Sequence, residues 1–127
     1  MKAAVILAAF LSAQGVLACS PAPEFVEMQA EGNVRGQMYI ALPPPPVSRP
    51  FEIGLLACGS EVRDIKVRAV MPAHNHGMNY VPVVAATDAQ KFDVSGLVFH
   101  MPGVWRIEVV AAINGTRERH TIEAIAR

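Results

Sequence analysis

Strict two-residue alternation near the end of the chain constrains the fold more than any other feature. In residues 103–113, apolar side chains occupy every second position from Trp105 to Ile113. The dipeptide Asn114-Gly115 follows, which is the strongest short hairpin signal, and residues 116–126 then alternate in the same way. The pattern predicts two long antiparallel strands joined by a tight turn, each with one face that a core must cover.

Five further segments have β character, and no segment after residue 18 has a convincing helical period. They cover residues 34–42, 51–58, 64–71, 79–87 and 91–101. Pro82 cannot donate to a ladder, so its segment is expected on a sheet edge, and the Pro-rich residues 43–50 predict an extended linker. About seven short strands predict an all-β fold, an immunoglobulin-like antiparallel β-sandwich.

The first 18 residues, MKAAVILAAFLSAQGVLA, have the order of an export signal. Lys2 gives a positive start, residues 3–11 are apolar, and Val16-Leu17-Ala18 is a small-residue cleavage pattern. A membrane anchor is the alternative, but polar residues and a glycine interrupt a segment shorter than the ~20 residues that span a bilayer. We therefore expect a signal peptide that is removed before Cys19.

Removal of 18 of the 127 residues would leave 109, which suits one domain with a modest core. We expect an N-terminal strand and the Pro-rich linker over residues 19–50 and the sandwich core over residues 51–127. Loss of Lys2 would leave ten basic and eleven acidic residues. This balance, without a basic run, argues against nucleic acid and against an electrostatically held membrane surface. The expected location is a bacterial periplasm.

Two cysteines, Cys19 and Cys58, permit two interpretations. An even count in an oxidising compartment favours one disulfide between them. Alternatively, Val16-Leu17-Ala18-Cys19 resembles a lipobox, and lipidation of Cys19 would anchor the chain to a membrane and leave Cys58 unpaired. Two thiols so far apart match no zinc-site spacing.

The stretch VMPAHNHGMNY, residues 70–80, concentrates imidazole and thioether groups. If residues 74–78 are extended, His74, His76 and Met78 point the same way. Imidazole nitrogen with thioether sulfur is a ligand set for copper, and thioether particularly selects Cu(I). Zinc would be expected to recruit thiolate or carboxylate ligands, which are absent from this stretch.

A second Met-Pro turn, FHMPG over residues 99–103, could complete the site. The loops at one end of a sandwich cluster, so a ligand from this turn could meet the first stretch. Met101 is the preferred ligand and His100 the alternative, because adjacent strand residues face opposite ways. Met71 is a weaker candidate, since its alternation places it with core residues.

A non-metal interpretation is the alternative. The methionines could fill the core, and the histidines could be solvated turn residues. The chain would then be an interaction or assembly module of the cell envelope, with the Met/His turn as its docking surface. His120 lies in the inward phase of the last strand and is expected to be a hydrogen-bonded structural histidine. No Ser-His-Asp order or paired-carboxylate pattern is present, so we expect no catalysis.

These two blocks, Met71 to Pro82 and Gly96 to Trp105, resemble the YtkA-like family of exported bacterial domains. The resemblance covers about residues 51–125. It implies an immunoglobulin-like sandwich similar in shape to CopC-type periplasmic copper carriers, and a role in handling copper with another periplasmic or membrane copper protein as partner. It also implies a set of motif positions: Met71, His74, His76, Met78, His100 and Met101. The segment between the blocks lacks the Gly-Asp-Gly turn expected of the family.

Overall fold

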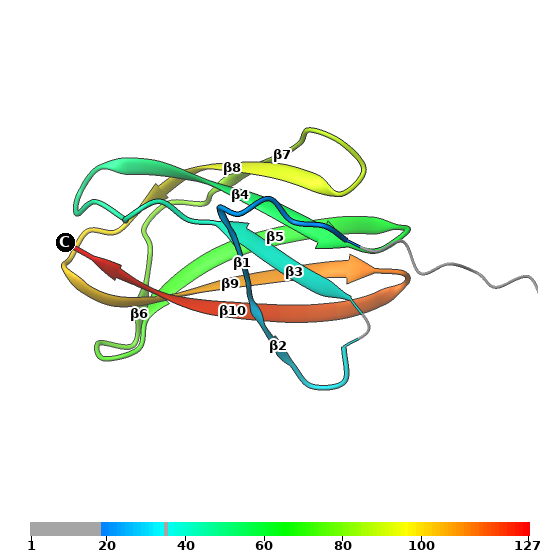
Figure 1. The fold of residues 1–127 in the computed structure, drawn as a ribbon. Coiled ribbons are helices and arrows are strands. Elements are labelled where there is room, and N and C mark those ends of the chain that lie inside the picture. The colour runs from blue at the N-terminus through cyan, green and yellow to red at the C-terminus, as the bar shows by residue number, and fades with distance from the viewer. Residues whose placement is uncertain (1–18, 35) are drawn as a thin grey trace, which may run out of the picture.

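Two five-stranded sheets pack face to face in the computed structural model, which describes residues 19–34 and 36–127 (Figure 1). The signal peptide predicted over residues 1–18 lies outside the described residues. The strands are β1 (Phe25–Glu27), β2 (Gln29–Glu31), β3 (Gln37–Ala41), β4 (Pro50–Cys58), β5 (Val62–Met71), β6 (His76–Gly77), β7 (Val83–Ala86), β8 (Lys91–Val98), β9 (Gly103–Ile113) and β10 (Thr116–Ala126). The predicted all-β sandwich is confirmed. A search of the described residues found no helix able to cross a bilayer.

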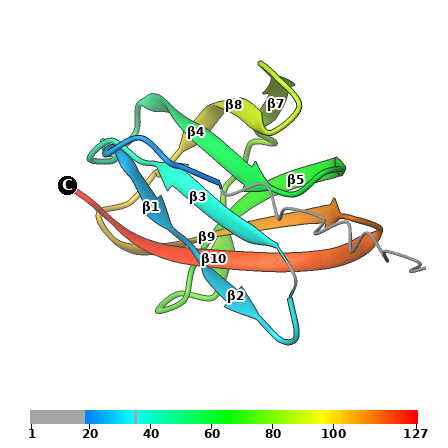
Figure 2. The ribbon, with the colours of Figure 1, turned by 45° about the vertical axis from the view of Figure 1, so that its right-hand side comes forward.

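The first sheet has the order β1-β3-β4-β8-β7 and the second has the order β2-β10-β9-β5-β6. All of these strand pairs are antiparallel. β1 and β2 belong to different sheets, so the chain changes sheet at Met28, whose backbone N–H donates to the Met38 carbonyl oxygen (Figure 2). Ten strand segments replace the expected seven because β1, β2 and β6 are too short for an alternation to be visible.

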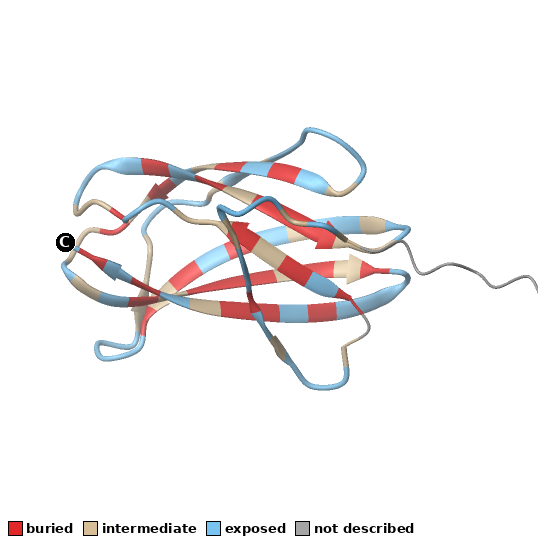
Figure 3. Ribbon diagram, in the orientation of Figure 1, coloured by how far each residue is buried: buried red, intermediate tan, exposed pale blue. Residues whose placement is uncertain are grey.

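The core lies between the sheets and consists of the inward-facing positions of each long strand (Figure 3). On β9, every predicted inward residue from Trp105 to Ile113 is fully buried. On β5, the same phase buries Val67, Ala69 and Met71. Alternation therefore predicted these two faces correctly.

A β-bulge in β8 changes which residues face the core. Phe51 pairs with Leu97 but Ile53 pairs with Val94, so two residues of β8 oppose one residue of β4. Gly96 has a φ of 81° there, a left-handed conformation that glycine adopts without steric cost. As a result, Phe92 and Val94 are buried before the bulge, and Leu97 and Phe99 are buried after it.

The predicted C-terminal hairpin is confirmed. Asn114 and Gly115 have φ values of 50° and 81°, the two positive values that a type I′ turn requires. The Asn114 side-chain oxygen accepts hydrogen bonds from the Ser60 N–H, the Ser60 hydroxyl and the Glu61 N–H at 3.0, 2.9 and 3.1 Å. One residue thus closes the β9–β10 turn and fixes the loop between β4 and β5.

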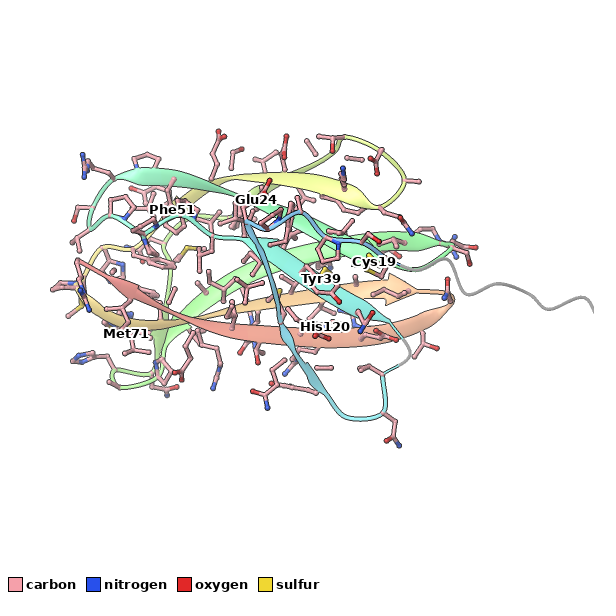
Figure 4. The ribbon with its side chains drawn as sticks, in the orientation of Figure 1. Cys19, Glu24, Tyr39, Phe51, Met71 and His120 are labelled. Carbon is pink, nitrogen blue, oxygen red and sulfur yellow. A yellow bond between two sulfur atoms is a disulfide. The ribbon has the colours of Figure 1, made fainter. Side chains whose placement is uncertain are left out.

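Cys19 and Cys58 form a disulfide, with their Cα atoms 5.6 Å apart. This confirms the predicted pairing and ties the start of the described chain to the end of β4. The sulfur atom that lipidation would use is the one in this bond. Met71 lies towards the opposite end of the sandwich from Cys19 (Figure 4).

Candidate metal site

The β5–β6 hairpin brings the first Met/His block into a compact turn. Met71 and His76 are the last paired residues of the ladder, and the His74 N–H donates to the Met71 carbonyl oxygen at 3.1 Å. Asn75 has a φ of 51°, a conformation that asparagine tolerates. The extended run supposed for residues 74–78 therefore holds only from His76 onward, because a turn is needed to reverse the chain.

The His76 side chain points towards the core. Paired residues of an antiparallel ladder project from the same face, and its partner Met71 is 2% exposed. The His76 ring lies with its centroid 5.0 Å from that of His100, at an interplanar angle of 29°. It also meets the Trp105 ring edge-on at a centroid distance of 5.8 Å.

The turn around His74 adds a third imidazole to this row. The His74 and His76 ring centroids are 5.8 Å apart, with an interplanar angle of 28°. His74 is exposed, whereas His76 and His100 are half-buried. The three rings therefore run from solvent towards the core, and His74 is the outermost.

Trp105 holds the second Met-Pro turn against the first. Its indole N–H donates to the Met101 carbonyl oxygen at 3.0 Å, and its ring stacks on Phe99 at a centroid distance of 4.7 Å. The His100 ring packs edge-on against the same indole at 5.3 Å. The prediction that the two turns meet at one end of the sandwich is confirmed.

Two buried histidine nitrogens, Nδ1 of His100 and Nδ1 of His120, have no hydrogen-bond partner among the described residues. Buried polar atoms are nearly always paired, because leaving one unpaired costs about 1–3 kcal/mol. Of the two, the His100 nitrogen belongs to a ring packed beside a second imidazole, that of His76, so it is the candidate lone-pair donor to an ion.

The three methionines of the two blocks occupy different environments. Met71 is buried in the core, and a Cβ added to Gly103 would lie 2.8 Å from the Met71 methyl carbon, so this side chain reaches the second turn. Met78 and Met101 are half-buried and pack against the core cluster. The core role predicted for Met71 is confirmed, while the assignment of Met78, Met101 or His100 as ligands stays a prediction.

The two turns supply imidazole and thioether groups, from His76, His100, Met78 and Met101. Within residues 19–34 and 36–127, no three His, Cys, Asp or Glu side chains are grouped as a metal site. Protein zinc sites use at least about three such ligands. An imidazole pair supplemented by a thioether would instead match the preference of Cu(I).

A buried polar pair on β10 was missed from the sequence. Glu118 and His120 are almost fully buried, and the His120 Nε2 lies 3.2 Å from a Glu118 carboxylate oxygen. The two Glu118 oxygens accept from the Gly36 N–H at 3.1 and 3.3 Å. His120 is thus the hydrogen-bonded structural histidine that was expected. The position of Glu118, two residues before it in the same phase, was the signal for this partner.

Comparisons of the chain with protein-family models, curated proteins and solved structures gave no match. The resemblance to the YtkA-like family therefore stays a prediction that rests on the two sequence blocks alone.

Proposed function

We propose that this protein binds copper, as Cu(I), at the end of the sandwich where the two Met-Pro turns meet. His76 and His100 would supply the imidazole ligands, and a methionine sulfur would supply the soft ligand. The observation that carries the proposal is the buried Nδ1 of His100, which has no hydrogen-bond partner among the described residues and belongs to a ring packed beside His76.

The surroundings of the two rings support this assignment. His76 and His100 come from different turns, yet both pack against Trp105, whose indole is anchored by Phe99 and by the Met101 carbonyl. Ligands fixed by packing before the ion arrives lose less conformational entropy when it binds.

His74 suits a transfer role at the mouth of the site. Its exposed ring lies beside His76, so an entering or leaving ion could exchange from one imidazole to the next. A module that hands copper to another envelope protein needs such an accessible outer ligand. The disulfide is consistent with an oxidising compartment, and we place the protein in the periplasm on the basis of the predicted signal peptide.

Competition with a coloured Cu(I) chelator under anaerobic conditions tests the proposal. The wild type is expected to withdraw one equivalent of Cu(I), and the variants His76→Phe and His100→Phe are expected to lose this ability. His120→Gln is the matched control, because His120 is a buried histidine bonded to Glu118 and packed against none of the three stacked rings. Failure of the folded wild type to compete for Cu(I) would leave the interaction-module alternative, with the Met/His turn as a docking surface.

A further inference from the structure

The free side of β5 borders a groove of about 820 Å³ on the second sheet. Its lining comes from β5, β9 and β10, from the segment that leads from β6 to β7, and from β7 itself. The lining residues include Lys66, Val67, Arg68, Tyr80, Val81 and Arg117. None of the three stacked histidines lines this groove, but Met78 does.

The backbone of β5 is open along this groove. β9 pairs with one side of β5, and in the described structure the strand on its other side, β6, pairs only with Val70 and Met71. The Met78 N–H donates to the Ala69 carbonyl oxygen, which adds one more hydrogen bond to the β5–β6 ladder. Because hydrogen-bonding direction alternates along a strand, Val67 presents its N–H and carbonyl to the groove in the same direction as Ala69.

The segment that leads from β6 to β7 exposes apolar side chains beside the groove. Tyr80 is 62% exposed and Val81 is 89% exposed, and Pro82 follows them. Scattered exposed apolar residues are common, but a contiguous patch beside an open strand edge marks an interaction surface.

The charged residues that line the groove are all cations. They are Lys66, Arg68, Arg117 and Arg119. Arg68 pairs with Glu108 and Arg119 pairs with Glu31. Lys66 and Arg117 form no ion pair with any residue that the structure describes. Lys66, on β5 itself, is therefore available to a ligand at this edge, whereas Arg117 lies two strands away on β10.

We infer that this groove binds an extended acidic segment of another protein, which adds to β5 as a further antiparallel strand. An added strand continues both faces of the sheet, and directly opposite side chains interact in pairs. On β5, Lys66 and Arg68 face outward and Val67 faces the core. The segment that fits alternates carboxylate side chains with apolar ones.

The same charges disfavour pairing of this edge with the β5 edge of a second copy of the protein. Pairing β5 with β5 of another molecule would place Lys66 and Arg68 near their own counterparts, and like charges opposite one another are destabilising. The partner is thus a different, acidic polypeptide, and its binding does not require copper.

Fluorescence anisotropy with a labelled short peptide that alternates glutamate with valine tests the inference. Two matched peptides serve as probes, one with lysine in place of glutamate and one with every second backbone amide methylated. The acidic peptide is expected to bind at low salt, and each matched peptide is expected to bind at least tenfold more weakly. Hydrogen exchange should then show protection of the Val67 amide.

The variant Lys66→Glu is expected to weaken binding of the acidic peptide at least tenfold, while the matched single charge reversal Arg49→Glu, whose side chain lies outside the groove, should leave it unchanged. Equal binding of the methylated peptide would overturn strand addition, and absence of binding by the acidic peptide would overturn the inference as a whole. Self-association of the wild type that Lys66→Glu abolishes would identify a second copy as the occupant and would also overturn the inference.

Discussion

The rings of His76 and His100 stack with their centroids 5.0 Å apart, although one belongs to the β5–β6 hairpin and the other to the turn between β8 and β9. This ring contact links the two turns, and both rings also pack edge-on against the indole of Trp105. The imidazole pair is therefore packed against a fully buried indole, and this packing underlies the predictions for the site.

Single Met→Leu substitutions distinguish a methionine that binds copper from one that only packs in the core. Leu replaces Met with little change in volume, so each substitution should lower the free energy of unfolding by less than about 1.5 kcal/mol. Met78→Leu and Met101→Leu should each weaken Cu(I) binding at least tenfold, because loss even of a group that only orients a metal ligand costs roughly 10–100-fold in affinity. Met71→Leu should change the affinity little, since Met71 is buried in the core.

Chelator competition on the three variants measures these affinities, and urea unfolding checks that each variant is folded. A large loss for Met71→Leu with none for Met101→Leu would assign the sulfur ligand to Met71, whose methyl carbon reaches the second turn near Gly103.

Removal of the disulfide should destabilise the protein without changing its fold. The bond closes a loop between residues 39 positions apart, for which the chain-entropy relation gives a loss of about 4 kcal/mol on removal. The double variant Cys19→Ser/Cys58→Ser should therefore unfold at a lower urea concentration, with an unchanged circular dichroism spectrum. Alkylation and mass spectrometry of the native protein should show both thiols blocked until reductant is added. A diacylglycerol mass on Cys19 would contradict the pairing.

Asn114→Ala should lower the free energy of unfolding by about 2 kcal/mol. The substitution removes the acceptor for the Ser60 and Glu61 groups and puts a residue with no polar side chain at a positive φ, and each effect costs about 1 kcal/mol. Asn79→Ala is the control, because Asn79 is exposed and has a negative φ. Equal midpoints for the two variants in urea would show that the Asn114 contacts contribute nothing.

The long strands were predictable because their alternation of apolar and polar residues extends over many positions. The short strands could not be predicted because they contain too few residues to show it. Residues 103–126 have a two-residue period and an Asn-Gly turn, so β9, β10 and their buried faces followed from the sequence. β1 and β2 have three residues each, too few to show a period, and their pairing depends on contacts with strands distant in the chain.

The site was predictable in position but not in detail. Two Met-Pro turns at strand ends were enough to expect one shared end of the sandwich. The bulge at Gly96 reverses the phase of β8, so the sequence alone could not determine whether His100 or Met101 would face the first turn. The structure places the His100 ring against His76, and Met101 contributes its carbonyl oxygen to Trp105.

The fluorescence of Trp105 during copper titration is the most direct test of Cu(I) binding by His76 and His100. Trp105 is the only tryptophan of the chain, and its ring contacts both His76 and His100, so its emission reports on the surroundings of these two rings. Anaerobic addition of Cu(I) is expected to quench the emission in a saturable way that ends at one equivalent. His76→Phe and His100→Phe should abolish this saturation, while His120→Gln should retain it. An emission that stays constant, or that saturates equally in the His100→Phe variant, would contradict copper binding by these two histidines.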